Sequence, residues 1–138
     1  MSQDARSFSW LLNGFVESTA GVSDAVAVSS DGLLMAMSSS LERPAAEQLA
    51  AIISGMVSLG NGASQCFGFE GLEQVIVAMR RGFLFMSSIS DGSCLGVVAT
   101  KACDIGLVGY QTTLLVERAG AVLTPSLVAE LKQEMLVS

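Results

Sequence analysis

The sequence predicts one α/β domain of the α+β kind, in which a five-stranded antiparallel sheet lies between helices in the order α-β-β-α-β-β-β-α. Two Asp-Gly pairs, Asp31-Gly32 and Asp91-Gly92, each lie between short apolar runs. This pattern is typical of β-hairpins because the tight turn needs a positive φ. Segments with helical periodicity precede, separate and follow the hairpins. The chain has 138 residues, 51% hydrophobic and 14% charged, which fits one folded domain and excludes a disordered chain.

The N-terminal part of the chain predicts a helix followed by a hairpin. The helix is expected at Ser7–Ser18, where apolar side chains fall on one face, and residues 1–6 are expected to form a short tail. Two strands are expected at Ala25–Ser29 and Leu33–Ser38. The turn Ser30-Asp31-Gly32 joins them as a hairpin, with an ordinary loop as the alternative.

A long helix is predicted in the middle of the chain. Pro44 suits its first turn, because the missing N–H would have no partner there. Ala45–Leu59 is rich in residues that helices favour or tolerate, and Gly60 and Gly62 are expected to end the helix or to fray its last turn.

Three further strands are predicted as a meander, at about Glu73–Arg80, Phe83–Ser90 and Cys94–Thr100. The last of them is apolar on both faces, which is typical of a central strand covered on both sides. Helices are therefore expected on both faces of the sheet.

The C-terminal part predicts two helices that complete a single domain over residues 7–138. Asp104 is expected to cap the first of these helices and Gly120 to end it. Thr124-Pro125 is expected to open a helical extension from about residue 124.

Charge and composition exclude several classes of function. The net charge is −6, and no basic stripe is visible, so neither nucleic acid nor an anionic membrane surface is an expected partner. The uncharged stretch Gln48–Phe69 is long enough to span a bilayer, but its polar residues and glycines argue against membrane insertion. The three widely spaced cysteines indicate reduced, buried thiols in a cytoplasmic protein, with a disulfide or redox role as the alternative.

Motifs for catalysis and cofactor binding are missing from the sequence. There is no histidine, which removes Ser-His-Asp and Cys-His systems and the commonest metal ligand. No phosphate-binding loop is present, and Gly60-Asn61-Gly62 lacks the third glycine of a dinucleotide fingerprint. We therefore expect a non-enzymatic protein with no catalytic residues, no cofactor and no metal.

Two features suggest association with another chain. The long helix is rich in small residues four apart, which allow close helix packing, although the same face suits the chain's own sheet equally well. The strand at Glu73–Arg80 begins the meander, so one of its edges is a candidate for pairing with a second copy. The candidate interface residues are Ala50, Ala51, Ser54, Gly55, Ser58, Gln74, Ile76 and Ala78.

The order of elements and several segments together resemble the Roadblock/dynein-light-chain domain, which is profilin-like. Specifically, the chain resembles the short stand-alone members found in actinobacterial operons called conservons. The segments that carry it, over about residues 8 to 132, are Trp10–Leu12, Val26–Ala36, Glu47–Gly55, Gly82–Phe85, Ser90–Leu95 and Leu123–Pro125.

This resemblance implies a homodimer formed through the third strands and the long helices. It also implies a scaffold or regulator of a small Ras-like GTPase, with a sensor-kinase-like protein as a further partner. Any effect on GTP hydrolysis would come from ordering the switch regions of the partner. The expected location is the cytoplasm, and recruitment to a membrane by a partner is left open.

Two alternatives belong to other classes of function. One is a small-molecule sensor or an adaptor domain of a kinase-linked signalling complex, which would show a pocket with converging polar groups. The other is an enzyme with a reactive cysteine at Cys94, which directly follows a turn. Its thiolate would have little help from neighbouring bases.

Overall fold

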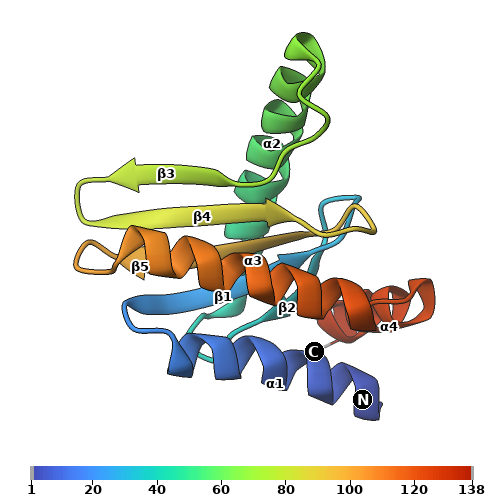
Figure 1. Cartoon of the computed structure of the whole chain (residues 1–138). Coiled ribbons are helices and arrows are strands. Elements are labelled where there is room, and N and C mark those ends of the chain that lie inside the picture. The colour runs from blue at the N-terminus through green and yellow to red at the C-terminus, as the bar shows by residue number, and fades with distance from the viewer. Residues whose placement is uncertain (1, 138) are drawn as a thin grey trace.

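The computed structural model describes residues 2–137 and confirms the predicted fold class (Figure 1). A five-stranded antiparallel sheet has the strand order β2-β1-β5-β4-β3, with β5 at the centre and β2 and β3 at the edges. The elements are α1 Gln3–Ser18, β1 Val22–Val28, β2 Leu34–Met37, α2 Arg43–Phe67, β3 Val75–Met79, β4 Gly82–Ser88, β5 Cys94–Thr100, α3 Ile105–Val122 and α4 Pro125–Val137.

Each face of the sheet has its own core. On one face, α1, α3 and α4 pack on a cluster that contains Phe8, Phe85 and Leu115. On the other face, α2 packs on a cluster that contains Ile53 and Met86, and Met135 at the end of α4 adds to its margin. Residues of β5 enter both clusters, because neighbouring side chains of a strand point to opposite faces, and this confirms the predicted central strand.

Both Asp-Gly turns form as predicted. Gly32 has φ +85° and Gly92 has φ +91°, a region that L-residues rarely adopt. In each turn the aspartate carboxylate accepts a hydrogen bond from a neighbouring residue: Asp31 from the Ser29 hydroxyl, and Asp91 from the backbone N–H of Ser93. These turns set the register of both hairpins.

The first helix begins earlier than predicted. The hydroxyl of Ser2 accepts a hydrogen bond from the N–H of Ala5 and caps α1, which therefore starts at Gln3. The fully buried Ala5 anchors this first turn in the core. Residues 3–6 are thus helical and do not form the expected tail.

The long helix ends eight residues later than predicted. Gly60 does not stop α2, because its bare Cα lies against the side chain of Leu72, where a Cβ would come within 2.8 Å of a methyl group. Gly62 also lies inside the helix. The helix ends at Gly68, whose φ of +66° lets the N–H of Phe69 donate to the carbonyl of Ser64.

The two C-terminal helices begin at the predicted N-caps, but the first of them does not end at Gly120 as predicted. Asp104 accepts a hydrogen bond from the N–H of Leu107, and Thr124 accepts one from Leu127. Helix α3 continues through Gly120 to Val122, because this glycine allows the helix to approach the hydroxyl of Ser90 closely.

Helix α4 lies beside the edge strand β2 and the N-terminal part of α1 (Figure 1). Its Leu127 and Leu131 are buried in the first core. Three polar contacts tie it to three separate elements: Ser2 N–H to Glu130, Lys132 to Asp31, and the Arg43 guanidinium to the carbonyl of Met135. Helix α4 is therefore an integral part of the domain.

Candidate interaction surface: an uncharged helix beside an open sheet edge

Helix α2 presents two faces of different character. Its inward face is buried on the sheet and consists of Ala46, Ala50, Ile53 and Val57, with Ser64 further along. Its outward face is exposed and consists of Gln48, Ala51, Ile52, Gly55, Leu59, Gly62, Ala63 and Cys66. No charged residue follows Glu47 in this helix. An exposed helix face in a globular protein is ordinarily polar or charged, so this one indicates burial against another molecule.

The C-terminal half of α2 extends beyond the edge of the sheet (Figure 1). The chain returns to β3 through Leu72, which packs against Gly60. At the tip of this projection Phe67 and Phe69 stack on each other with ring centroids 5.5 Å apart. Each is 71% exposed. The projection thus ends in two aromatic rings that contact little besides each other.

Strand β3 is an edge strand, as the sequence predicted, and pairs within the chain only with β4. Val75 and Val77 lie opposite Met86 and Leu84 on the face that α2 covers. Ile76 lies opposite Phe85 on the face of α1 and α3 and is 46% exposed. The free edge of β3 begins beside the base of the projecting part of α2 (Figure 1), so one partner can contact both.

The structure divides the small residues predicted to form the helix part of the interface. Ala51, Gly55 and Ser58 are exposed on α2, as an interface requires. Ala50 is only 2% exposed and packs on the chain's own sheet. Ser54 is half-buried beside the β1–β2 turn, where its hydroxyl limits the space at Gly32. The alternative that the small residues pack on the sheet thus applies to Ala50 and in part to Ser54.

The strand residues predicted for the same interface lie on the opposite face of the sheet from α2. Ile76 and Ala78 are exposed there. The side-chain amide of Gln74 instead donates to the Ser87 hydroxyl and to the carbonyl of Gly109, and each donor–acceptor distance is 3.3 Å. Its side chain holds β3 against α3 and is not available to a partner in this arrangement.

Several exposed apolar residues of this surface were not among the predicted interface residues. They are Ile52, Leu59, Phe67 and Phe69, which are 48%, 73%, 71% and 71% exposed. The signal that could have found them is the uncharged stretch Gln48–Phe69, in which these four apolar residues lie among small and polar ones. In the part of the chain that the structure describes, no helix is long and apolar enough to cross a bilayer.

The chemistry of the cysteines does not favour a catalytic thiol. Cys94 is buried beside the β4–β5 turn, and burial, with the charge of Asp91, raises the pKa of its thiol. A raised pKa keeps the thiol protonated and unreactive at neutral pH. Cys103 is half-buried, but Cys66 is exposed on α2, so the expectation of three buried cysteines is wrong for Cys66. Within residues 2–137 no group of His, Cys, Asp or Glu side chains could hold a metal ion.

The sequence and the fold both match a known family. The profile of the Roadblock/LC7 domain matches residues 8–99, about two thirds of the chain. The chain belongs to the Roadblock/LC7 family. A solved Roadblock/LC7 domain from Streptomyces avermitilis is 34% identical, has a TM-score of 0.75, and covers 80% of this chain and 92% of its own. A comparison with curated proteins gave no match.

More distant structures share the Roadblock/LC7 fold. MglB of Myxococcus xanthus has a TM-score of 0.77 at 14% identity, over 84% of this chain and 94% of that chain. Profilin IA of Acanthamoeba castellanii has a TM-score of 0.51 at 15% identity, over 83% of this chain and 97% of that chain. At these identities the likeness shows the fold alone, and it confirms the profilin-like architecture.

The Roadblock/LC7 match includes the whole candidate surface, because α2 and β3 both lie within residues 8–99. It ends before α3 and α4 begin. The uncharged face of α2 and the open edge of β3 therefore belong to the part of the chain that defines the family.

Proposed function

We propose that this Roadblock/LC7 protein is a homodimer that scaffolds or regulates a small Ras-like GTPase and catalyses no reaction itself. The observation that carries the proposal is the uncharged outward face of α2, which projects beyond the free edge of β3. Members of the family that the sequence resembles scaffold or regulate such GTPases, and this supports the choice of partner.

A second copy of the chain fits the surface better than an unrelated protein because the surface is self-complementary. Two β3 edges that pair antiparallel around a two-fold axis would form one continuous sheet across both copies. In that arrangement the exposed Glu73 at one end of the strand approaches the exposed Arg80 at the other end of the partner strand. The projecting Phe67 and Phe69 of each copy then lie over the other copy. One of the structural neighbours is described as MglB with a tetrameric arrangement, which shows self-association of that protein.

The dimer is tested by a charge placed on the outward face of α2. Leu59→Glu introduces it at a residue that is 73% exposed, so the fold of the monomer should tolerate it within about 0.5 kcal/mol. Leu136→Glu on α4 is the matched control, since Leu136 is 72% exposed and lies outside the surface. We expect light scattering to give twice the chain mass of 14.3 kDa for the wild type and the control, and the chain mass for Leu59→Glu. A monomeric wild type at micromolar concentration would contradict the proposal.

The GTPase is tested with purified small Ras-like GTPases loaded with GDP or with a GTP analogue. We expect binding that depends on the nucleotide state, because the switch regions are what differs between the two states. Any acceleration of hydrolysis should survive Cys66→Ser, since the proposal assigns no reacting group to this chain. Equal binding of both nucleotide states, or no binding of either, would count against a GTPase regulator.

A further inference from the structure

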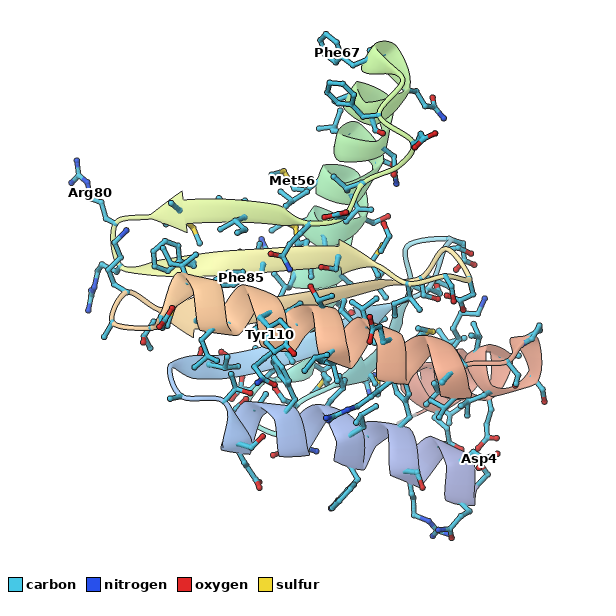
Figure 2. All side chains as sticks on the ribbon, in the orientation of Figure 1. Asp4, Met56, Phe67, Arg80, Phe85 and Tyr110 are labelled. Carbon is cyan, nitrogen blue, oxygen red and sulfur yellow. The ribbon has the colours of Figure 1, made fainter. Side chains whose placement is uncertain are left out.

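A second surface lies on the other face of the sheet, between α1 and α3. Two adjoining hollows of about 500 and 270 Å³ share Trp10, Leu11 and Arg118 as lining residues. Together they form one depression, here named the α1–α3 groove. It extends along α1 from Asp4 to Thr19, a distance of about 22 Å for helical residues. The sheet separates it from α2 (Figure 2).

Trp10 is the most prominent side chain of the groove. It is the only tryptophan of the chain and is 77% exposed. The opposite side of α1 carries the residues that hold the helix on the sheet, including the fully buried Leu12, so Trp10 is not needed for the core. Exposed tryptophan is costly in water, and tryptophan is among the residues that dominate binding energy at interfaces.

The walls of the groove favour a helix as its occupant. The walls are themselves helices, whose backbone hydrogen bonds are internal, so they offer no free N–H or C=O groups to an extended peptide. An amphipathic helix satisfies its own backbone and needs only apolar contacts from the groove. Beside Trp10, the half-buried Leu11 and the exposed Val122 supply such contacts, and the buried Phe8, Phe15 and Leu127 form the floor beneath them. A groove of about 22 Å accommodates a helix of about 15 residues.

The charges of the groove define the occupant further. Arg118 lines both hollows and is therefore central, whereas Asp4 lines only the hollow at the N-terminal end of α1. Arg118 forms no ion pair or hydrogen bond with any other residue of the described chain. An acidic side chain near the middle of a bound helix would neutralise Arg118, and a basic one at the end near Asp4 would complete the match.

We propose that the α1–α3 groove binds an amphipathic helix of a partner protein, with an acidic residue at the centre of its apolar stripe. Trp10 packs on this stripe and Arg118 pairs with the acid. The groove lies on the face opposite to α2, so this inference goes beyond the proposed dimer and GTPase and does not depend on either. The partner helix and the second copy can be bound at the same time.

The test uses two synthetic helical peptides of about 15 residues, a length that matches the groove. Both peptides carry the same leucine stripe and a lysine at one end. They differ only in the residue at the centre of the stripe, which is glutamate in one peptide and lysine in the other. Titration into the full chain is followed by the emission of the single tryptophan and by the anisotropy of labelled peptide. We expect the glutamate peptide to shift the emission to shorter wavelength and to bind at least about tenfold more tightly than the lysine peptide, which corresponds to about 1.4 kcal/mol.

Variants of the chain make the test specific. Trp10→Ala should weaken binding of the glutamate peptide at least tenfold by anisotropy. Tyr110→Ala, at a residue of α3 that is 61% exposed and does not line the groove, should leave it unchanged. Arg118→Glu should reverse the preference in favour of the lysine peptide. Absence of binding by the glutamate peptide, equal binding of both peptides, or an unchanged preference in Arg118→Glu would overturn the proposal.

Discussion

Gly96 lies at the point where α2 rests on the central strand, and Gly96→Ala tests how tightly this contact is packed. A Cβ on Gly96 would lie 2.0 Å from Cδ1 and 3.0 Å from Cγ1 of Ile53, and 3.4 Å from Cγ2 of Val26. Carbon atoms in contact are ordinarily about 3.5–4.0 Å apart. Ile53 is fully buried on the inward face of α2, so its side chain has no solvent-filled space into which it can turn.

The size of the effect follows from two opposing contributions. Overpacking a filled core costs about 1–3 kcal/mol. Replacing glycine by alanine also restricts the unfolded chain, which stabilises the fold by about 0.4–1 kcal/mol where no strain opposes it. We therefore expect Gly96→Ala to lower the free energy of unfolding by about 1–2 kcal/mol. Urea denaturation at one fixed protein concentration measures this change. Gly14→Ala is the control, because nothing lies within 4 Å of its Cβ position in α1 and a gain in stability is expected.

A second substitution separates this explanation from a general weakness of the strand. Ile53→Val removes the Cδ1 methyl that the new Cβ would meet, and by itself it should cost about 0.5–1.5 kcal/mol. When Ile53→Val is added to Gly96→Ala, it should cost much less than it does in the wild type, or it should restore stability. The reason is that the methyl group lost from Ile53 leaves the space that the new Cβ at position 96 needs. Additive losses in the double variant, or a Gly96→Ala protein as stable as the wild type, would refute the reasoning.

Three further predictions concern the cysteines, the C-terminal helix and a cap. Alkylation of the native protein at neutral pH should modify the exposed Cys66 first and Cys94 last, since burial raises the pKa of Cys94. Hydrogen bonds from Ser29 and, to a smaller degree, from Lys132 of α4 lower the pKa of Asp31, and hydrogen bonds from Ser2 lower the pKa of Glu130. The contacts that tie α4 to Asp31 and Ser2 therefore stabilise it above about pH 4, and this stabilisation is lost as the pH falls through the lowered pKa values. Amide exchange in α4, corrected for its intrinsic pH dependence, should accelerate there relative to β5. Asp104→Ala removes the cap of α3 and should cost about 1 kcal/mol, or a Tm decrease of about 2–4 °C by calorimetry.

The fold was predictable where a local signal decides the structure. The Asp-Gly pairs at Asp31 and Asp91 require a particular backbone conformation, and the apolar composition of β5 requires cover on both faces. The errors lie where a tertiary contact overrides a local preference. Gly60 and Gly120 were expected to end helices, but each allows another segment to approach a continuing helix, and this contact is absent from the local sequence.

The candidate surface was predictable in its elements and less so in its residues. The long helix and the first strand of the meander both carry it, as expected. Helical spacing alone does not show which face of α2 the sheet covers, so Ala50 was assigned to the wrong face. Ala50 shares the buried stripe of Ile53 and Val57, but Ile52 and Leu59 on the exposed face are also large and apolar, so the sequence does not tell the two stripes apart. Phe67 and Phe69 lay beyond the helix end that Gly60 appeared to set, and so received no role.

The central position of β5 gives the two surfaces a common mechanical support. The strand is buried on both faces, with Ile53 of α2 against Gly96 on one side and the α1–α3 core, including Phe8, on the other. A packed interior of this kind transmits displacements and does not absorb them. A partner helix that pushed α1 outward would therefore act on the sheet to which α2 is anchored. If dimer formation fixes α2 and β3, it also stiffens the floor of the groove, and the two binding events should favour each other. Dissociation of the dimer by Leu59→Glu should then weaken binding of the glutamate peptide, although Leu59 lies on the opposite face, and unchanged affinity would show that the two surfaces are independent.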